Sequence, residues 1–217
     1  MIYVPASDLD DWRKLLADPE KHWRPGYSAQ ATAQAWQIAG GLPPEVADIL
    51  GPGAELLLAI PEHKVPMPGR GRESQCDVFA LAKAGGQIIA VAVEGKVAEP
   101  FGPTIGEWLA APTREKTARI SAICGMLGLR ALPEPSLRYQ LFHRTAAAVI
   151  EARRFETDAA AMIVHSFSPQ HLWFDDFVAF CAAFDLTPTR GAASVATLPD
   201  GRRLILGWAS GPSAMTA

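Results

Sequence analysis

Two acids and a lysine lie at the ends of two neighbouring predicted strands, one at the start of its strand and two at the finish of the next. Residues 87–93 are rich in Ile and Val and follow a Gly85-Gly86 turn, a pattern typical of a buried strand. Glu94, Gly95 and Lys96 come directly after them. Because residues i and i+2 of a strand share a face, we expect Glu94 and Lys96 to project side by side, while Gly95 leaves the space between them open.

Asp77 is the second acid of this group. It stands seventeen positions before Glu94, at the start of residues 76–82, which we interpret as the preceding strand. A turn over residues 83–86 would pair the two strands as a hairpin. We therefore expect Asp77, Glu94 and Lys96 to meet at one end of a sheet.

An acid followed by an acid-x-lysine on the next strand is typical of a two-carboxylate metal site. Two carboxylates hold Mg²⁺, which completes its shell with water and substrate phosphate. A neighbouring lysine can orient an attacking water or neutralise charge that develops on a phosphoryl group. The alternative interpretation is a structural ion pair at the end of a strand.

The pattern resembles the signature of the PD-(D/E)xK nuclease superfamily, with Asp77, Glu94 and Lys96 in its positions. Cys76 replaces the usual proline and Gly95 the usual apolar residue, but neither change removes a side-chain ligand. The resemblance implies phosphodiester hydrolysis with Mg²⁺ or Mn²⁺, and DNA or RNA as the partner. It assigns Asp77 and Glu94 to the metal and Lys96 to the attacking water.

The order of predicted elements extends this resemblance. We expect helices, three strands, helices, a strand, a helix and a closing hairpin, hence a single α/β domain over residues 1–217 with a mixed sheet. The middle resembles the αβββαβ core of the restriction-endonuclease-like fold. That core would cover residues 43–168, with an N-terminal helical extension over 1–42, a C-terminal α-β-β addition over 169–210 and a frayed tail over 211–217.

Local signals set several boundaries. Gly40 and Gly128 are predicted to end helices, Pro112 or Thr113 to begin one, and Ser168-Pro169 to cap another. Residues 21–26 are predicted to form a loop.

A long predicted helix, residues 137–155, supplies two further candidates. Superfamily members resemble this chain in placing a helix with polar residues after the lysine strand, packed against the catalytic end. We expect Gln140 and Arg144 to face the site and assist catalysis, while Leu141 and Val149 are buried.

Charged residues in two loops are further candidates. Arg70 and Arg72 lie just before Asp77, where they could bind substrate phosphate or belong to a solvated turn. Glu99 follows the lysine strand and is a candidate to support the metal ligands from behind, although a solvated loop acid is the simpler interpretation.

Composition and the apolar pattern argue against several classes of protein. The net charge of −3 argues against a protein that coats nucleic acid by bulk charge. Three distant cysteines indicate a reducing compartment, and the apolar runs are too short to span a bilayer. The first five residues show no secretory signal, so the cytoplasm is the expected location. The oligomeric state stays open, and a homodimer is possible.

Three functions remain open from the sequence. The first is a metal-dependent nuclease. The second is a non-catalytic nucleic-acid-binding or protein-interaction module of the same fold, and the third is a small-molecule enzyme with Glu94 and Lys96 as an acid–base pair. In the metal-free nuclease Asp77 and Glu94 would repel each other, so we expect removal of either carboxylate to leave the fold intact.

Overall fold

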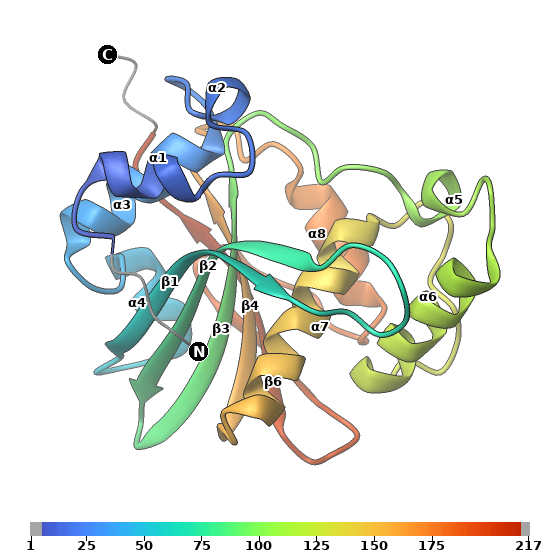
Figure 1. Cartoon of the computed structure of the whole chain (residues 1–217). Helices are drawn as coiled ribbons and strands as arrows, with labels where there is room; N and C mark the ends of the chain where they lie inside the picture. Colours follow the sequence, from blue (N-terminus) through green and yellow to red (C-terminus); the bar gives the residue numbers. More distant parts are fainter. Residues whose placement is uncertain (1–5, 214–217) are drawn as a thin grey trace.

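A computed structural model describes residues 6–213. Within this range the chain forms one six-stranded sheet in the order β1-β2-β3-β4-β6-β5 (Figure 1). Its strands are β1 (Glu55–Val65), β2 (Ser74–Ala84), β3 (Gln87–Lys96), β4 (Ala159–Ser166), β5 (Ala193–Thr197) and β6 (Arg203–Ser210). The β1–β2–β3 and β5–β6 pairings are antiparallel, and β3–β4–β6 is parallel. The predicted mixed α/β architecture is confirmed.

Helices cover both faces of this sheet (Figure 1). They are α1 (Leu9–Leu15), α2 (Pro19–His22), α3 (Ser28–Ala39), α4 (Pro44–Leu50), α5 (Ile105–Trp108), α6 (Arg114–Leu127), α7 (Tyr139–Arg154) and α8 (Phe174–Ala182). The helices α1, α3 and α4 pack on one face, and α6, α7 and α8 pack on the other. The N-terminal helices thus form part of one layer, rather than an appendage at the edge.

The alternation of side chains along β3 explains why the strand sequence is almost continuously apolar. Ala90 and Ala92 enter the core under α7, whereas Val91 and Val93 enter the core under α3. A strand buried on both faces needs apolar residues at every position. By the same alternation Glu94 follows Ala92 onto the α7 face.

Predicted helix boundaries are confirmed at three positions. Gly40 and Gly128 adopt left-handed backbone at the ends of α3 and α6, with φ of 57° and 78°. Thr113 caps α6 by accepting a hydrogen bond from the backbone N–H of Lys116.

Three local predictions were wrong. The last helix does not begin at Ser168-Pro169, because the Ser168 hydroxyl instead accepts from the N–H of Leu172 and the helix starts only at Phe174. The predicted loop at residues 21–26 begins inside α2, which Asp18 caps. Gly211 is not frayed, since its N–H donates to Ser166 at 2.8 Å. The rest of the predicted tail from residue 214, and the first five residues, lie outside the described range.

The β1–β2 hairpin bends away from the sheet at Glu62 and Asp77. Cys76 and Phe79 both enter the core under α7, although regular alternation would send residues three apart to opposite faces. The strand that pairs with β2 here is β1, which contains Glu62, and the φ of +52° at Glu62 is a left-handed conformation. Beyond this bend the hairpin crosses α7 (Figure 1), and the Ser74 hydroxyl contacts both His143 and Arg144.

Among residues 6–213 no helix is long and apolar enough to cross a lipid bilayer.

Candidate functional site

A cavity of about 450 Å³ opens beside the bend of the β1–β2 hairpin. Pairing between β2 and β3 stops at Val78 and Val93, so the next residues, Asp77 and Glu94, border the opening. We call this space the acidic cavity. It is lined by Leu16, Ala17, Lys21, His22, Tyr27, Ser28, Ala29, Glu62, Gln75, Asp77, Glu94, Glu99, Gln140 and Arg144.

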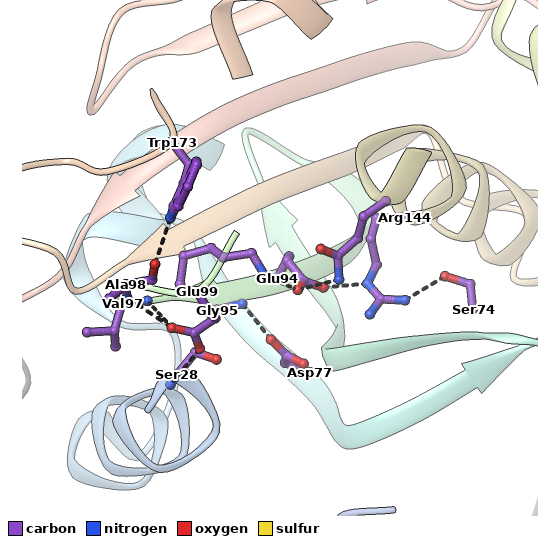
Figure 2. A network of polar contacts seen from close by, with 12 residues as sticks. Ser28, Ser74, Asp77, Glu94, Gly95, Val97, Ala98, Glu99, Arg144 and Trp173 are labelled. Atoms are coloured by element: carbon purple, nitrogen blue, oxygen red, sulfur yellow. Dashed lines mark hydrogen bonds and ion pairs between the residues drawn. The ribbon is translucent and has the colours of Figure 1, made fainter. Parts of the chain in front are cut away.

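Glu94 is the most strongly bound carboxylate of the cavity (Figure 2). Its Oε1 accepts from Lys96 Nζ at 2.5 Å and Gln140 Nε2 at 2.7 Å, and its Oε2 accepts from Arg144 Nε at 2.5 Å. Burial alone would raise the pKa of Glu94, but the charges of Arg144 and Lys96 outweigh burial and lower it to about 2. Glu94 is therefore ionised at any pH near neutrality.

Lys96 lies beside Glu94, as the i, i+2 spacing predicts, but it does not line the acidic cavity. Only 3% of Lys96 is exposed, and its Nζ lies 5.1 Å from the centre of the Phe101 ring. The ammonium group thus stands behind Glu94, between that carboxylate and the core.

Asp77 borders the cavity at the point where β2 leaves β3. Its Oδ2 accepts from the backbone N–H of Gly95 at 2.6 Å (Figure 2). Burial, together with the negative charge of Glu94, raises the pKa of Asp77 to about 7. The two predicted metal ligands thus share one cavity but differ in charge near neutral pH.

The open space expected between Glu94 and Lys96 is absent, because the two side chains are bonded directly, and α3 fills the space over Gly95. A Cβ atom at Gly95 would collide with the Thr32 hydroxyl and lie 3.2 Å from Asp77 Oδ2. The correction follows from the alternation of β3, since Gly95 faces α3 while Glu94 and Lys96 face α7. Glycine at this position allows α3 to approach the strand closely.

Glu62 is a third acid of the cavity, and no pattern in the sequence selects it. Its Oε2 accepts from Gln75 Nε2 at 2.6 Å. Burial and the charge of Asp77 raise the pKa of Glu62 to about 8. The direction of the Glu62 side chain depends on the left-handed backbone at the hairpin bend. The sequence does not signal such a conformation at a residue other than glycine.

The N-terminal part of α7 presents both predicted polar residues to the site. Gln140 and Arg144 line the acidic cavity, and both donate to Glu94. Leu141 and Val149 are fully buried, as the helical spacing predicts.

Glu99 connects the end of β3 to α3. Its carboxylate accepts from the N–H of Ser28 at 2.9 Å, at the start of α3, and from the N–H groups of Val97 and Ala98 (Figure 2). Burial opposes ionisation, but the hydrogen bonds of Ser28 lower the pKa of Glu99. Although Glu99 lines the cavity, these contacts make it a structural link between two walls.

Arg70 and Arg72 do not enter the acidic cavity. They line a separate cavity on the far side of the bent hairpin, next to α6. Their backbone carbonyls accept from Arg119, which lies on α6 and holds the loop in place. Both arginines are close to Asp77 along the chain, and for this reason the sequence suggested that they bind substrate beside it. The bend of the hairpin instead places them at the other cavity.

The donor chemistry of the acidic cavity suits a hard divalent cation. Asp77 and Glu62 each keep one carboxylate oxygen without a hydrogen-bond partner among the described residues, and both have raised pKa values that a bound cation would lower. Glu94 is ionised but engaged by three donors. In the described part of the chain, no three His, Cys, Asp or Glu side chains converge closely enough to hold an ion as they stand. A site with three such ligands therefore requires Glu94 or Glu62 to reorient.

Comparison with known proteins finds a matching family, and the description of that family gives no activity. The model of a family described as Domain of unknown function (DUF6946) matches residues 5–213, almost the whole chain. No curated protein and no solved structure matches the sequence.

Proposed function

We propose that this chain, which belongs to the family described as Domain of unknown function (DUF6946), is a Mg²⁺- or Mn²⁺-dependent nuclease-like phosphodiester hydrolase. The observation that supports the proposal best is the meeting of Asp77 and Glu94 at one cavity, with Lys96 and Gln140 bonded to Glu94. As part of this proposal, strands β1–β4 and helix α7 correspond to the restriction-endonuclease-like core.

The charge balance of the cavity favours a cation before a phosphate. Four carboxylates line it, against the side chains of Lys21 and Arg144. With Asp77 and Glu62 ionised, an anionic substrate alone would meet net negative charge, whereas a divalent cation would displace the protons of these two acids and attract phosphate.

Asp77 and Glu94 would hold the ion, and Glu62 is the available third ligand. When bound, such an ion polarises a phosphoryl oxygen and lowers the pKa of a coordinated water. Lys96 and Arg144 keep Glu94 ionised, and Gln140 fixes the orientation of its carboxylate. We propose that Lys96 assists the attacking water once Glu94 turns toward the ion.

A second candidate function is a non-catalytic nucleic-acid-binding or protein-interaction module. The observation that favours it is the engagement of Glu94 by Lys96, Gln140 and Arg144. A carboxylate with this set of donors is also a complete structural network, which needs no metal.

The test combines ion binding with cleavage. Thermal unfolding is measured with EDTA, Mg²⁺ or Mn²⁺ for the wild type, Asp77→Asn and the control Asp48→Asn. Asp48 is an exposed acid of α4 that lines neither the acidic cavity nor the cavity that contains Arg70 and Arg72. The same proteins are assayed for nicking of single- and double-stranded DNA and RNA.

For a nuclease we expect the ion to raise the melting temperature of the wild type and of Asp48→Asn, because a ligand stabilises the state that binds it. Asp77→Asn should lose both the shift and the cleavage. Ion binding without cleavage would favour the binding module. A wild type that does not respond to either ion would contradict the metal-dependent proposal.

A further inference from the structure

A second cavity, of about 550 Å³, lies between the tip of the β1–β2 hairpin and α5, α6 and α7. We call it the basic cavity. Its lining residues are Met67, Arg70, Gly71, Arg72, Glu73, Pro103, Trp108, Thr113, Glu115, Lys116, Arg119, Tyr139 and His143. It shares no lining residue with the acidic cavity.

The basic cavity is positive, although the whole chain has a net charge of −3. Four cationic side chains line it, against Glu73 and Glu115. Among the described residues, none of the four cations forms an ion pair with a carboxylate: Arg70, Arg72, Lys116 and Arg119. Their charge is therefore available to an external anion.

Arg119 gives the cavity a fixed wall. It is 7% exposed and donates to the backbone carbonyls of Pro68, Arg70 and Arg72, at 3.2, 3.0 and 2.8 Å. Gly71 permits this contact, because a Cβ atom there would lie 2.9 Å from an Arg119 nitrogen. With its backbone bound in this way, the loop presents the side chains of Arg70 and Arg72 from a defined position.

His143 adds a neutral hydrogen-bond donor. Arg144 Nη1 donates to the Ser74 hydroxyl, and that hydroxyl lies 2.9 Å from His143 Nδ1. Since the hydroxyl oxygen already accepts from Arg144, its own proton is best placed on Nδ1, which leaves the ring proton on Nε2. His143 lines the basic cavity and so can donate to a ligand there.

The aromatic residues of the cavity favour phosphate over a nucleobase as the bound group. The Trp108 ring stacks on Tyr139 with centroids 4.0 Å apart, and Lys116 Nζ lies 5.5 Å from the Trp108 ring. Lys116 Nζ is further held by the carbonyls of Trp108 and Ala111. The aromatic pair therefore positions a cation instead of offering a platform for a base.

We propose that the basic cavity binds backbone phosphates of a nucleic-acid strand that continues into the acidic cavity. Both cavities border the N-terminal part of α7, where Tyr139 lines one and Gln140 lines the other. The identity of the strand rests on the proposed nuclease function. Arg70 and Arg72 thus bind substrate away from the reacting phosphate, and the acidic cavity itself needs no arginine from this loop.

The test measures binding without cleavage. The affinity of a fluorescent single-stranded DNA oligonucleotide is measured by anisotropy in EDTA at several salt concentrations. The variant is Arg70→Gln with Arg72→Gln. The matched control is Arg130→Gln with Arg190→Gln, which removes the same charge from exposed positions outside both cavities.

We expect the Arg70/Arg72 variant to lose roughly tenfold or more in affinity, and its log–log salt slope to fall by about 1.4 if both contacts are phosphates. The control should change less than twofold, and millimolar inorganic phosphate should compete for the wild type only weakly. Equal losses in both double variants, or no binding by the wild type, would overturn the proposal. Binding that depends on Arg70 and Arg72 without any metal-dependent cleavage would leave it standing and reject the nuclease function instead.

Discussion

The chemistry of single residues in the acidic cavity depends on how their charges are paired. Glu94 neutralises two buried cations, whereas Asp77 accepts only one backbone hydrogen bond. This difference changes the expectation that either carboxylate can be removed without harm to the fold. For Asp77 the expectation is retained, but for Glu94 the cations would be left without their partner.

We predict that Glu94→Gln destabilises the metal-free protein by about 3–5 kcal/mol, because removal of one partner leaves buried charge uncompensated. Asp77→Asn should cost less than about 1 kcal/mol, since its amide oxygen can still accept from Gly95. Urea unfolding in EDTA measures both values. Similar costs for the two variants would show that Arg144 and Lys96 do not depend on Glu94.

Asp77 and Glu62 should make the protein less stable as pH rises, whereas a salt-bridged acid makes a protein more stable as pH rises. Their pKa values are raised to about 7 and about 8, from ordinary values of 3.8 and 4.5. Between about pH 4 and 8 the folded protein therefore binds more protons than the unfolded chain, so the free energy of unfolding falls as pH rises.

The corresponding measurement is the melting temperature in EDTA from pH 5 to 8.5. We expect it to decrease across this range for the wild type, through the raised pKa values of Asp77 and Glu62. Asp77→Asn should flatten the curve and be the more stable protein at pH 8.5, because it no longer titrates and no longer repels Glu62. Parallel curves would contradict this account.

At the scale of elements, the site depends on how closely α3 approaches β3. We predict that Gly95→Ala lowers stability by roughly 1–3 kcal/mol, the range for overpacked sites, because its methyl group would collide with the Thr32 hydroxyl. Thr32→Ala alone should cost only about 1 kcal/mol, through the loss of a buried methyl group, since the buried hydroxyl has no hydrogen-bond partner in the described residues.

The double variant is the decisive control for this contact. Thr32→Ala should restore most of the stability that Gly95→Ala loses, and chemical unfolding of the four proteins gives the coupling energy. Additive effects would mean that the Gly95 site tolerates a side chain by some movement other than that of Thr32.

Elements with a strong pattern could be predicted from the sequence, and elements set by tertiary contacts could not. The run in β3 and the spacing of Glu94 and Lys96 define one face of a strand, and helical spacing placed Gln140 and Arg144 on the side of α7 toward that face. The hairpin bend has no such local signal. It depends on left-handed backbone at Glu62 and on the Arg119 contacts, and so Glu62 was missed and Arg70 and Arg72 were placed at the wrong cavity.

At the scale of the whole molecule, both layers of helices build the acidic cavity. Residues from Leu16 to Ala29 form one wall, while α7 forms another. The N-terminal helices also supply Trp12 and Trp36 to the core under α3. Formation of the site should therefore require the fold of the entire chain.

We accordingly predict that the N-terminal helices unfold together with the sheet. Trp36 is 4% exposed in the core, whereas Ile38, on the same helix, is 85% exposed. Trp36→Ala should cost about 3–5 kcal/mol, as for other buried aromatic residues, and Ile38→Ala should change stability by less than about 0.5 kcal/mol. Circular dichroism and tryptophan fluorescence should report the same transition in the wild type and in both variants. If the two signals instead report transitions at different temperatures in Trp36→Ala, the N-terminal helices form a separate folding unit, and the acidic cavity loses one wall before the sheet unfolds.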